Sequence, residues 1–215
     1  MRIRIEATRV YIAAGIAILA SVLGLPADSA VAAFSDRSRP EATAIRYLPS
    51  LGETQVAARI DQALCLAFSL PQEWRRVPAG NGAALHLAAA TGDGAIEIAF
   101  RSMRDLMELP QADPITRDAA FLQRDHEGVF GRPAQASSLE SVPGATRWTA
   151  TWIDGNLPSS THMLTLETYI VRASPDWMLE ISISDIDDRD TYDTLVQRVL
   201  ANLQTADPAR CGRPG

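Results

Sequence analysis

The chain contains no lysine, and all 20 of its basic residues are arginine. Without lysine there can be no phosphate-binding P-loop lysine, no Schiff base to a pyridoxal cofactor and no Ser-x-x-Lys nucleophile. No glycine is followed two positions later by serine, which excludes the Gly-x-Ser-x-Gly elbow of hydrolases. These absences exclude several enzyme classes, but they leave open a catalytic site that has no sequence signature.

Cysteine is scarce too, with only Cys65 and Cys211 in the chain. Two cysteines cannot build an all-cysteine zinc or iron–sulfur site, and we expect neither a metal nor another cofactor. In an oxidising compartment the pair predicts a disulfide, which on the chain-entropy model would stabilise so long a loop by roughly 4–5 kcal/mol. Two separate free thiols are the alternative.

The chain has no basic stripe, and its formal net charge is −6. Phosphate binding requires basic surface, so this acidic balance argues against a general nucleic-acid binder. No segment after the first 32 residues is long and apolar enough to span a membrane, and we expect no stable membrane insertion of the mature chain.

The N-terminus has the pattern of a cleavable signal peptide. Arginines precede an apolar run from Val10 to Leu25, and Ala30-Val31-Ala32 places small residues at a cleavage site after Ala32. The run is shorter than the roughly 20 residues of a comfortable membrane span, although an uncleaved anchor is the alternative. The pattern predicts export to the periplasm.

The remainder divides into a flexible lead-in (33–52), one domain (53–207) and a polar tail (208–215). Spacing and turn residues predict the elements of this domain. They are a helix at Thr54–Leu64, strands at Cys65–Leu70, Ala84–Ala89 and Ala95–Ser102, a helix from Asp113-Pro114 to Gly131, a three-stranded meander (Ser137–Trp152, His162–Arg172, Trp177–Ile183) and a final helix at Arg189–Gln204.

His126 is the strongest candidate for a functional side chain. It continues the apolar face of its predicted helix, which also carries Ile115, Ala119, Leu122 and Val129. It could serve as a general base or a metal ligand. The simpler interpretation is a histidine at the edge of the core, because no second histidine stands at ligand spacing.

Two further patterns have both a functional and a structural interpretation. Trp148 and Trp152, with Trp177, could line a ligand groove, although strand tryptophans at alternating positions are more often core. The aspartates from Asp185 to Asp190 could recruit calcium, but they lack the glycine and glutamate of a calcium loop. Their place before a helix favours capping, by Asp187 or Asp188.

One short motif points to a family. The segment Phe68-Ser69-Leu70-Pro71-Gln72-Glu73-Trp74 resembles the opening of PsbP-like and DcrB-like domains, and the order of predicted elements from Leu64 to Leu203 is similar to theirs. The resemblance implies an α+β fold in which an antiparallel sheet has helices on both faces, an α/β/α sandwich. It also implies a non-catalytic, exported accessory protein, and it transfers no functional residues.

The sequence therefore favours a non-enzymatic accessory or binding protein with a protein partner in the periplasm or envelope. Two alternatives stay open. One is an enzyme with a site near His126, Asp125 and Glu127; the other is a small-ligand carrier that uses the strand tryptophans.

Overall fold

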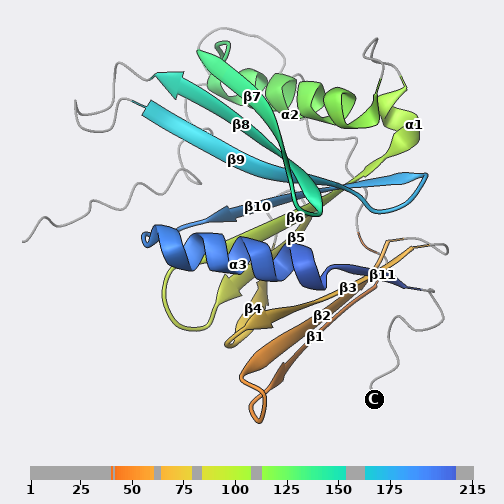
Figure 1. Cartoon of the computed structure of the whole chain (residues 1–215), viewed down its shortest axis with the longest axis vertical. Helices are drawn as coiled ribbons and strands as arrows, with labels where there is room; N and C mark the ends of the chain where they lie inside the picture. The colour runs from red at the N-terminus through yellow and green to blue at the C-terminus, as the bar shows by residue number, and fades with distance from the viewer. Residues whose placement is uncertain are drawn as a thin grey trace, which may run out of the picture.

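The computed structural model describes residues 40, 42–60, 64–78, 84–107, 113–153 and 163–206 (Figure 1). These ranges form mostly β-strands. The strands are β1 (Ala42–Leu48), β2 (Glu53–Arg59), β3 (Cys65–Pro71), β4 (Trp74–Val77), β5 (Ala84–Ala89), β6 (Ala95–Ser102), β7 (Ala136–Val142), β8 (Ala145–Ile153), β9 (Met163–Arg172), β10 (Trp177–Ser184) and β11 (Gln204–Ala206). The helices are α1 (Met103–Leu106), α2 (Pro114–Phe130) and α3 (Arg189–Asn202).

The strands form two antiparallel sheets. One has the order β1-β2-β3-β11, and the other has the order β4-β5-β6-β10-β9-β8-β7. The predicted α/β/α sandwich, a single sheet between layers of helices, is therefore wrong, and so is the fold that the family resemblance implies. The difference arises largely from residues 42–59, which form β1 and β2 of a second sheet rather than a lead-in and a helix.

The helix predicted at Thr54–Leu64 is wrong for a simple reason. The apolar residues of this segment recur every four positions, and four is a multiple of the two-residue period of a strand as well as close to a helical turn. In the structure Thr54, Val56 and Ala58 alternate as buried residues of β2, and Val56 lies opposite Phe68 of β3. The described fold thus includes β1, inside the segment expected to be a flexible lead-in.

The hairpin and the middle helix are confirmed. β5 and β6 pair antiparallel, and Gly92 in their connection has the positive φ of 88° that the turn requires. Asp113 caps α2 by accepting a hydrogen bond from the Thr116 amide at 2.9 Å, and Gly131 ends the helix in the left-handed conformation.

The second half contains two strands more than predicted. The segment predicted as a single strand at Ser137–Trp152 is the hairpin of β7 and β8, because the chain turns at Gly144 with a φ of 81°. The strand and the turn that follow, β9 and the bend before Trp177, agree with the prediction. Asp188 caps α3, and the chain then adds the short strand β11, which the pattern did not indicate.

Two hydrophobic cores result. The first core lies between the two sheets and α3, where Leu66 of β3, Leu179 of β10 and Val199 of α3 are among its buried members. The second core lies between α2 and the seven-stranded sheet. Its buried members are Leu106, Ala119, Phe121, Leu122, Trp148, Ala150, Trp152, Ile170 and Met178.

Several predictions concern residues outside the described ranges. The signal peptide lies wholly outside them, as does Cys211, so cleavage and the disulfide stay predictions. Cys65 is buried in β3, and the pairing of β11 with β3 places Ala206 opposite it. Within the described ranges, no helix is both long and apolar enough to cross a membrane.

Candidate functional site

The seven-stranded sheet divides between β9 and β10. These two strands pair only from Met178↔Arg172 to Ile181↔Tyr169. Both continue beyond that point, because β10 stays paired with β6 as far as Ser184 and β9 stays paired with β8 as far as Met163. The two strands diverge in Figure 1, and the Thr168 and Ser182 hydroxyl oxygens, 2.8 Å apart, mark the point of divergence.

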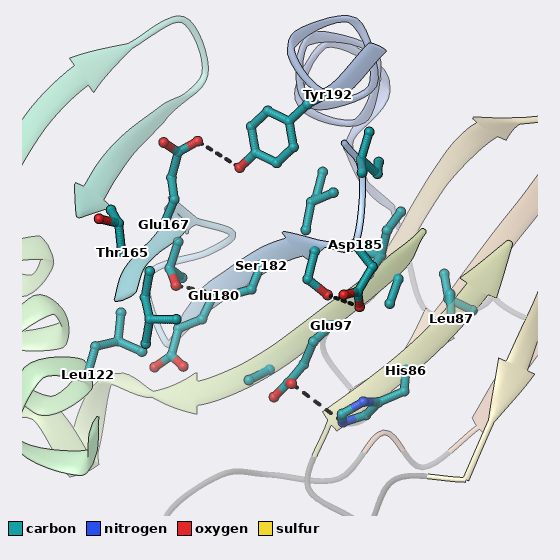
Figure 2. A pocket seen from close by; sticks show the side chains of 18 of the residues that line it. His86, Leu87, Glu97, Leu122, Thr165, Glu167, Glu180, Ser182, Asp185 and Tyr192 are labelled. Carbon is teal, nitrogen blue, oxygen red and sulfur yellow. Dashed lines mark hydrogen bonds and ion pairs between the residues drawn. The ribbon is translucent and has the colours of Figure 1, made fainter. Parts of the chain in front are cut away.

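A cleft of about 720 Å³ lies at this divergence, and we call it the fork cleft. Its lining includes residues 164–168 of β9 and residues 182–187, which continue β10 toward α3; Leu122 and His126 of α2 also contribute. One face of a paired strand presents only alternate residues. Since consecutive residues line the fork cleft, the cleft meets the edges of β9 and β10 as well as their faces (Figure 2).

The lining of the fork cleft is acidic. Among the described residues that line it, the charged side chains are the carboxylates of Glu97, Glu167, Glu180, Asp185 and Asp187 and the guanidinium of Arg189. Glu97 lies 3.8 Å from His86, a contact too long for a strong hydrogen bond, and Figure 2 shows this pair at the opposite end of the cleft from Glu167. A site of this composition favours a positively charged ligand.

Glu167 is held by two tyrosines. Tyr192 of α3 donates to its Oε1 atom at 2.7 Å, Tyr169 of β9 donates to the same atom, and Arg147 lies 3.7 Å from Oε2. Burial, together with the Glu167 carboxylate, raises the pKa of Tyr169 to about 12 and also raises the pKa of Tyr192. Both phenols therefore stay protonated at neutral pH and fix the direction of the carboxylate.

Glu180 joins the cleft to a buried cluster of charges. Arg101 Nε donates to Glu180 at 2.8 Å and lies 2.8 Å from Asp118, while its Nη2 atom donates to Asp125 at 3.4 Å. Arg101 and Glu180 are only 1% and 2% exposed, and Asp118 is fully buried. This charge cluster connects β6 and β10 to α2, with three carboxylates around one guanidinium.

The imbalance of charge shifts the pKa values of the cluster. Burial raises the pKa of Asp118 well above the usual carboxyl range, and repulsion by Glu180 adds to this, while Arg101 opposes it. Burial alone would lower the pKa of Arg101, but attraction to Glu180, Asp118 and Asp125 outweighs burial and raises it. We therefore expect Asp118 to keep its proton where an exposed aspartate would have lost it.

The side chains that the sequence singled out as functional candidates lie in different environments in the structure. His126 lines the fork cleft and stacks on Trp148, with ring centroids 5.7 Å apart. Trp148 and Trp152 are 1% and 0% exposed members of the second core and do not line the cleft, and Trp177 packs against the first core. The tryptophans thus have the structural role that their spacing favoured.

The residues proposed around His126 do not form one site. Asp125 contacts Arg101 in the charge cluster, while Glu127 accepts hydrogen bonds from Gln123 and from the Ala134 amide beyond the end of α2. Of the aspartates before α3, Asp188 accepts from the Thr191 amide at 2.7 Å, as capping predicts. Within the described ranges, no group of three or more potential ligands is arranged to hold a metal ion.

Sequence reasoning missed Arg101, Asp118, Glu180 and Glu167. Glu180 lies between the inward-facing Leu179 and Ile181, so strict alternation assigns it to solvent. Because α2 covers that face of the sheet, the residue is buried instead. The one available signal was Asp118 and Asp125, which stand seven residues apart and thus share a helix face next to Leu122.

Comparisons of the chain with protein-family models, with curated proteins and with solved structures find no match. The candidate site therefore rests on the geometry of the cleft and on the chemistry of its lining.

Proposed function

We propose that this chain is an exported, non-enzymatic binding protein of the periplasm or cell envelope, and that it holds a protein partner in the fork cleft. Export rests on the signal-peptide pattern of residues 1–32. Binding rests on one structural observation, the cleft of about 720 Å³ where β9 and β10 separate. A concave site with a few convergent polar groups is the usual setting for recognition.

The polar groups of the cleft suit recognition. Glu167 is fixed by two phenols, and Glu180 is fixed by the Arg101 guanidinium. Of the two, Glu167 has the more accessible side chain, 17% exposed against 2% for Glu180, so it can present a charge at a defined position, and little conformational entropy is lost when a partner binds to it. The partly exposed side chains of Leu164 and Leu166 add apolar area that a partner could bury.

The test uses a photoactivatable amino acid at Ser184, which lies on β10 and lines the fork cleft. We expect irradiation of cells to join the chain to one dominant envelope protein, identified by mass spectrometry. The matched control carries the same group at Ser138, an exposed position on β7 away from the cleft. Crosslinks that are absent, or that are equal at the two positions, would contradict the proposal.

One observation favours an enzyme as the second candidate. His126 and Glu180 line the same cleft, and Asp118, whose pKa is raised, lies beside Glu180 in the charge cluster. The variant His126→Gln separates the two functions. If the chain is a binding protein, the variant should still crosslink to its partner. If it is an enzyme, the molecule captured by the wild type should have a changed mass, and the molecule captured by the variant should not.

A further inference from the structure

We infer that the fork cleft binds an extended, positively charged peptide segment by strand addition, with the segment lying between the separated parts of β9 and β10. The inference rests on the proposed function and specifies the chemistry of its partner. Three observations carry it: the strand edges at the cleft, the extent of the hollow surface and the charge of the lining.

The strand edges supply main-chain hydrogen-bonding groups. Beyond the Ile181↔Tyr169 pair, β9 continues from Thr168 back to Met163, and β10 continues to Ser184. Along these stretches neither strand is paired with the other. Each therefore presents backbone N–H and C=O groups toward the cleft, where an added strand could satisfy them. A small rigid molecule would make less use of two such edges.

The hollow surface continues past the fork cleft. A second hollow of about 530 Å³ shares Asp185 and Ile186 with it and extends to Trp74 and to the β5–β6 turn at Gly92. Gln72 and Asp185, the two non-glycine residues with positive φ in the described ranges, both line this second hollow. An elongated surface suits an extended chain of several residues better than a compact ligand.

The charge of the lining selects the kind of segment. Carboxylates at Glu97, Asp185 and Asp187 line the fork cleft, and Asp93 and Asp190 line the second hollow. Arginine or lysine side chains of an added strand would meet these groups at alternate positions, whereas acidic segments, phosphates and nucleic acids would be repelled. The apolar side chains of Leu164, Leu166 and Ile186 would contact residues between the charged ones.

The experiment is a selection from a display library of random seven-residue peptides, with the full-length chain as bait. We expect the enriched peptides to carry arginine or lysine at alternate positions, with β-branched or aromatic residues between them. Methylation of alternate backbone nitrogens in the best peptide should abolish its binding, because the methyl groups remove the donors of one strand edge. No enrichment, enrichment of acidic peptides, or full binding after methylation would each overturn the inference.

Two variants locate the binding. Ser184→Trp should fill the cleft and weaken the best peptide at least tenfold, while Ser138→Trp on exposed β7 should leave it unchanged. The double variant Glu97→Gln/Asp187→Asn should weaken it about tenfold at low salt and less at high salt. Its control, Glu73→Gln/Asp176→Asn, removes the same charge from residues that line neither the fork cleft nor the second hollow.

The outcomes separate this inference from the function on which it rests. An envelope partner that crosslinks at Ser184, combined with a library that yields no basic peptides, would support the proposed function and overturn the strand-addition inference. A crosslink from Ser184 to another segment of the same chain would overturn both, because the cleft would then be filled by the protein itself.

Discussion

The two cores of the molecule differ in what they bury. The first core, between the sheets and α3, consists of aliphatic side chains such as Leu66 and Leu179 and aromatic ones such as Phe100. The second core, under α2, adjoins the charge cluster, where Arg101 also lies 4.8 Å from the ring centre of Phe121. An apolar core is nearly indifferent to pH, whereas a core beside three carboxylates and one guanidinium depends on how many protons those groups hold.

The largest effect should follow from removing the central charge with Arg101→Met. This change removes the positive charge that Arg101 places beside the buried Asp118, Asp125 and Glu180, which should lower the free energy of unfolding by about 3–5 kcal/mol at neutral pH. The loss should shrink at pH 4.5, where protonation relieves the repulsion among the carboxylates. Urea unfolding at the two pH values measures it.

The comparison variant is Leu179→Ala in the first core, at a side chain that is 0% exposed. We expect a loss of about 2–5 kcal/mol from the cavity, and the loss should be the same at both pH values. If the Arg101→Met loss is also independent of pH, the contrast between the two cores does not hold.

A second prediction concerns the proton on Asp118. Its pKa is raised in the folded chain, so the stability linked to this group is fully present below the unfolded pKa near 4 and is lost as the pH rises through the folded pKa. Over that window wild-type stability should fall, at most by about 1.4 kcal/mol per pH unit. Asp118→Asn should flatten the fall, since asparagine has no proton to lose.

The measurement is urea unfolding in steps of one pH unit from 4 to 9. Asp176→Asn is the control, because Asp176 is exposed in the turn before β10 and its substitution should leave the slope unchanged. A wild-type slope that persists in Asp118→Asn would assign the proton to another group.

The smallest effect should come from the helix caps, Asp113→Ala on α2 and Asp188→Ala on α3. Each change removes a hydrogen bond to a backbone amide; Asp113→Ala should cost about 1 kcal/mol, and Asp188→Ala should destabilise α3 in the same direction. If the two cores open separately, hydrogen exchange should rise in α2 for the first variant and in α3 for the second. A rise in both helices for either variant would show that the cores open as one unit.

Local signals predicted many of the individual helices and strands correctly, although the predicted fold was wrong. The hairpin of β5 and β6 follows from glycine in its turn, and α2 follows from the Asp113-Pro114 start and the Gly131 end, because these residues act through their own backbone geometry. Predictions failed where a period was ambiguous, as at Val56 and Ile60, or where a turn was overlooked, as at Gly144.

The candidate site was largely beyond sequence reasoning. His126 was singled out, and it does line the fork cleft, but the residues beside it come from strands far away in the chain. Glu167 meets Tyr192 across 25 positions, and Arg101 meets Glu180 across 79. No local periodicity in the sequence predicts such contacts, because they depend on the order of the strands in the sheet.

By itself the sequence excluded several enzyme classes and established the acidic charge, because both follow from composition. It also predicted most of the local elements, since caps and turn residues act over a few neighbouring positions. Only the tertiary structure decided that residues 42–59 build a second sheet, that α2 buries Glu180, and that β9 and β10 separate to open a cleft. The physical reason is that burial and strand pairing are set by what packs against a residue, and those partners come from distant parts of the chain.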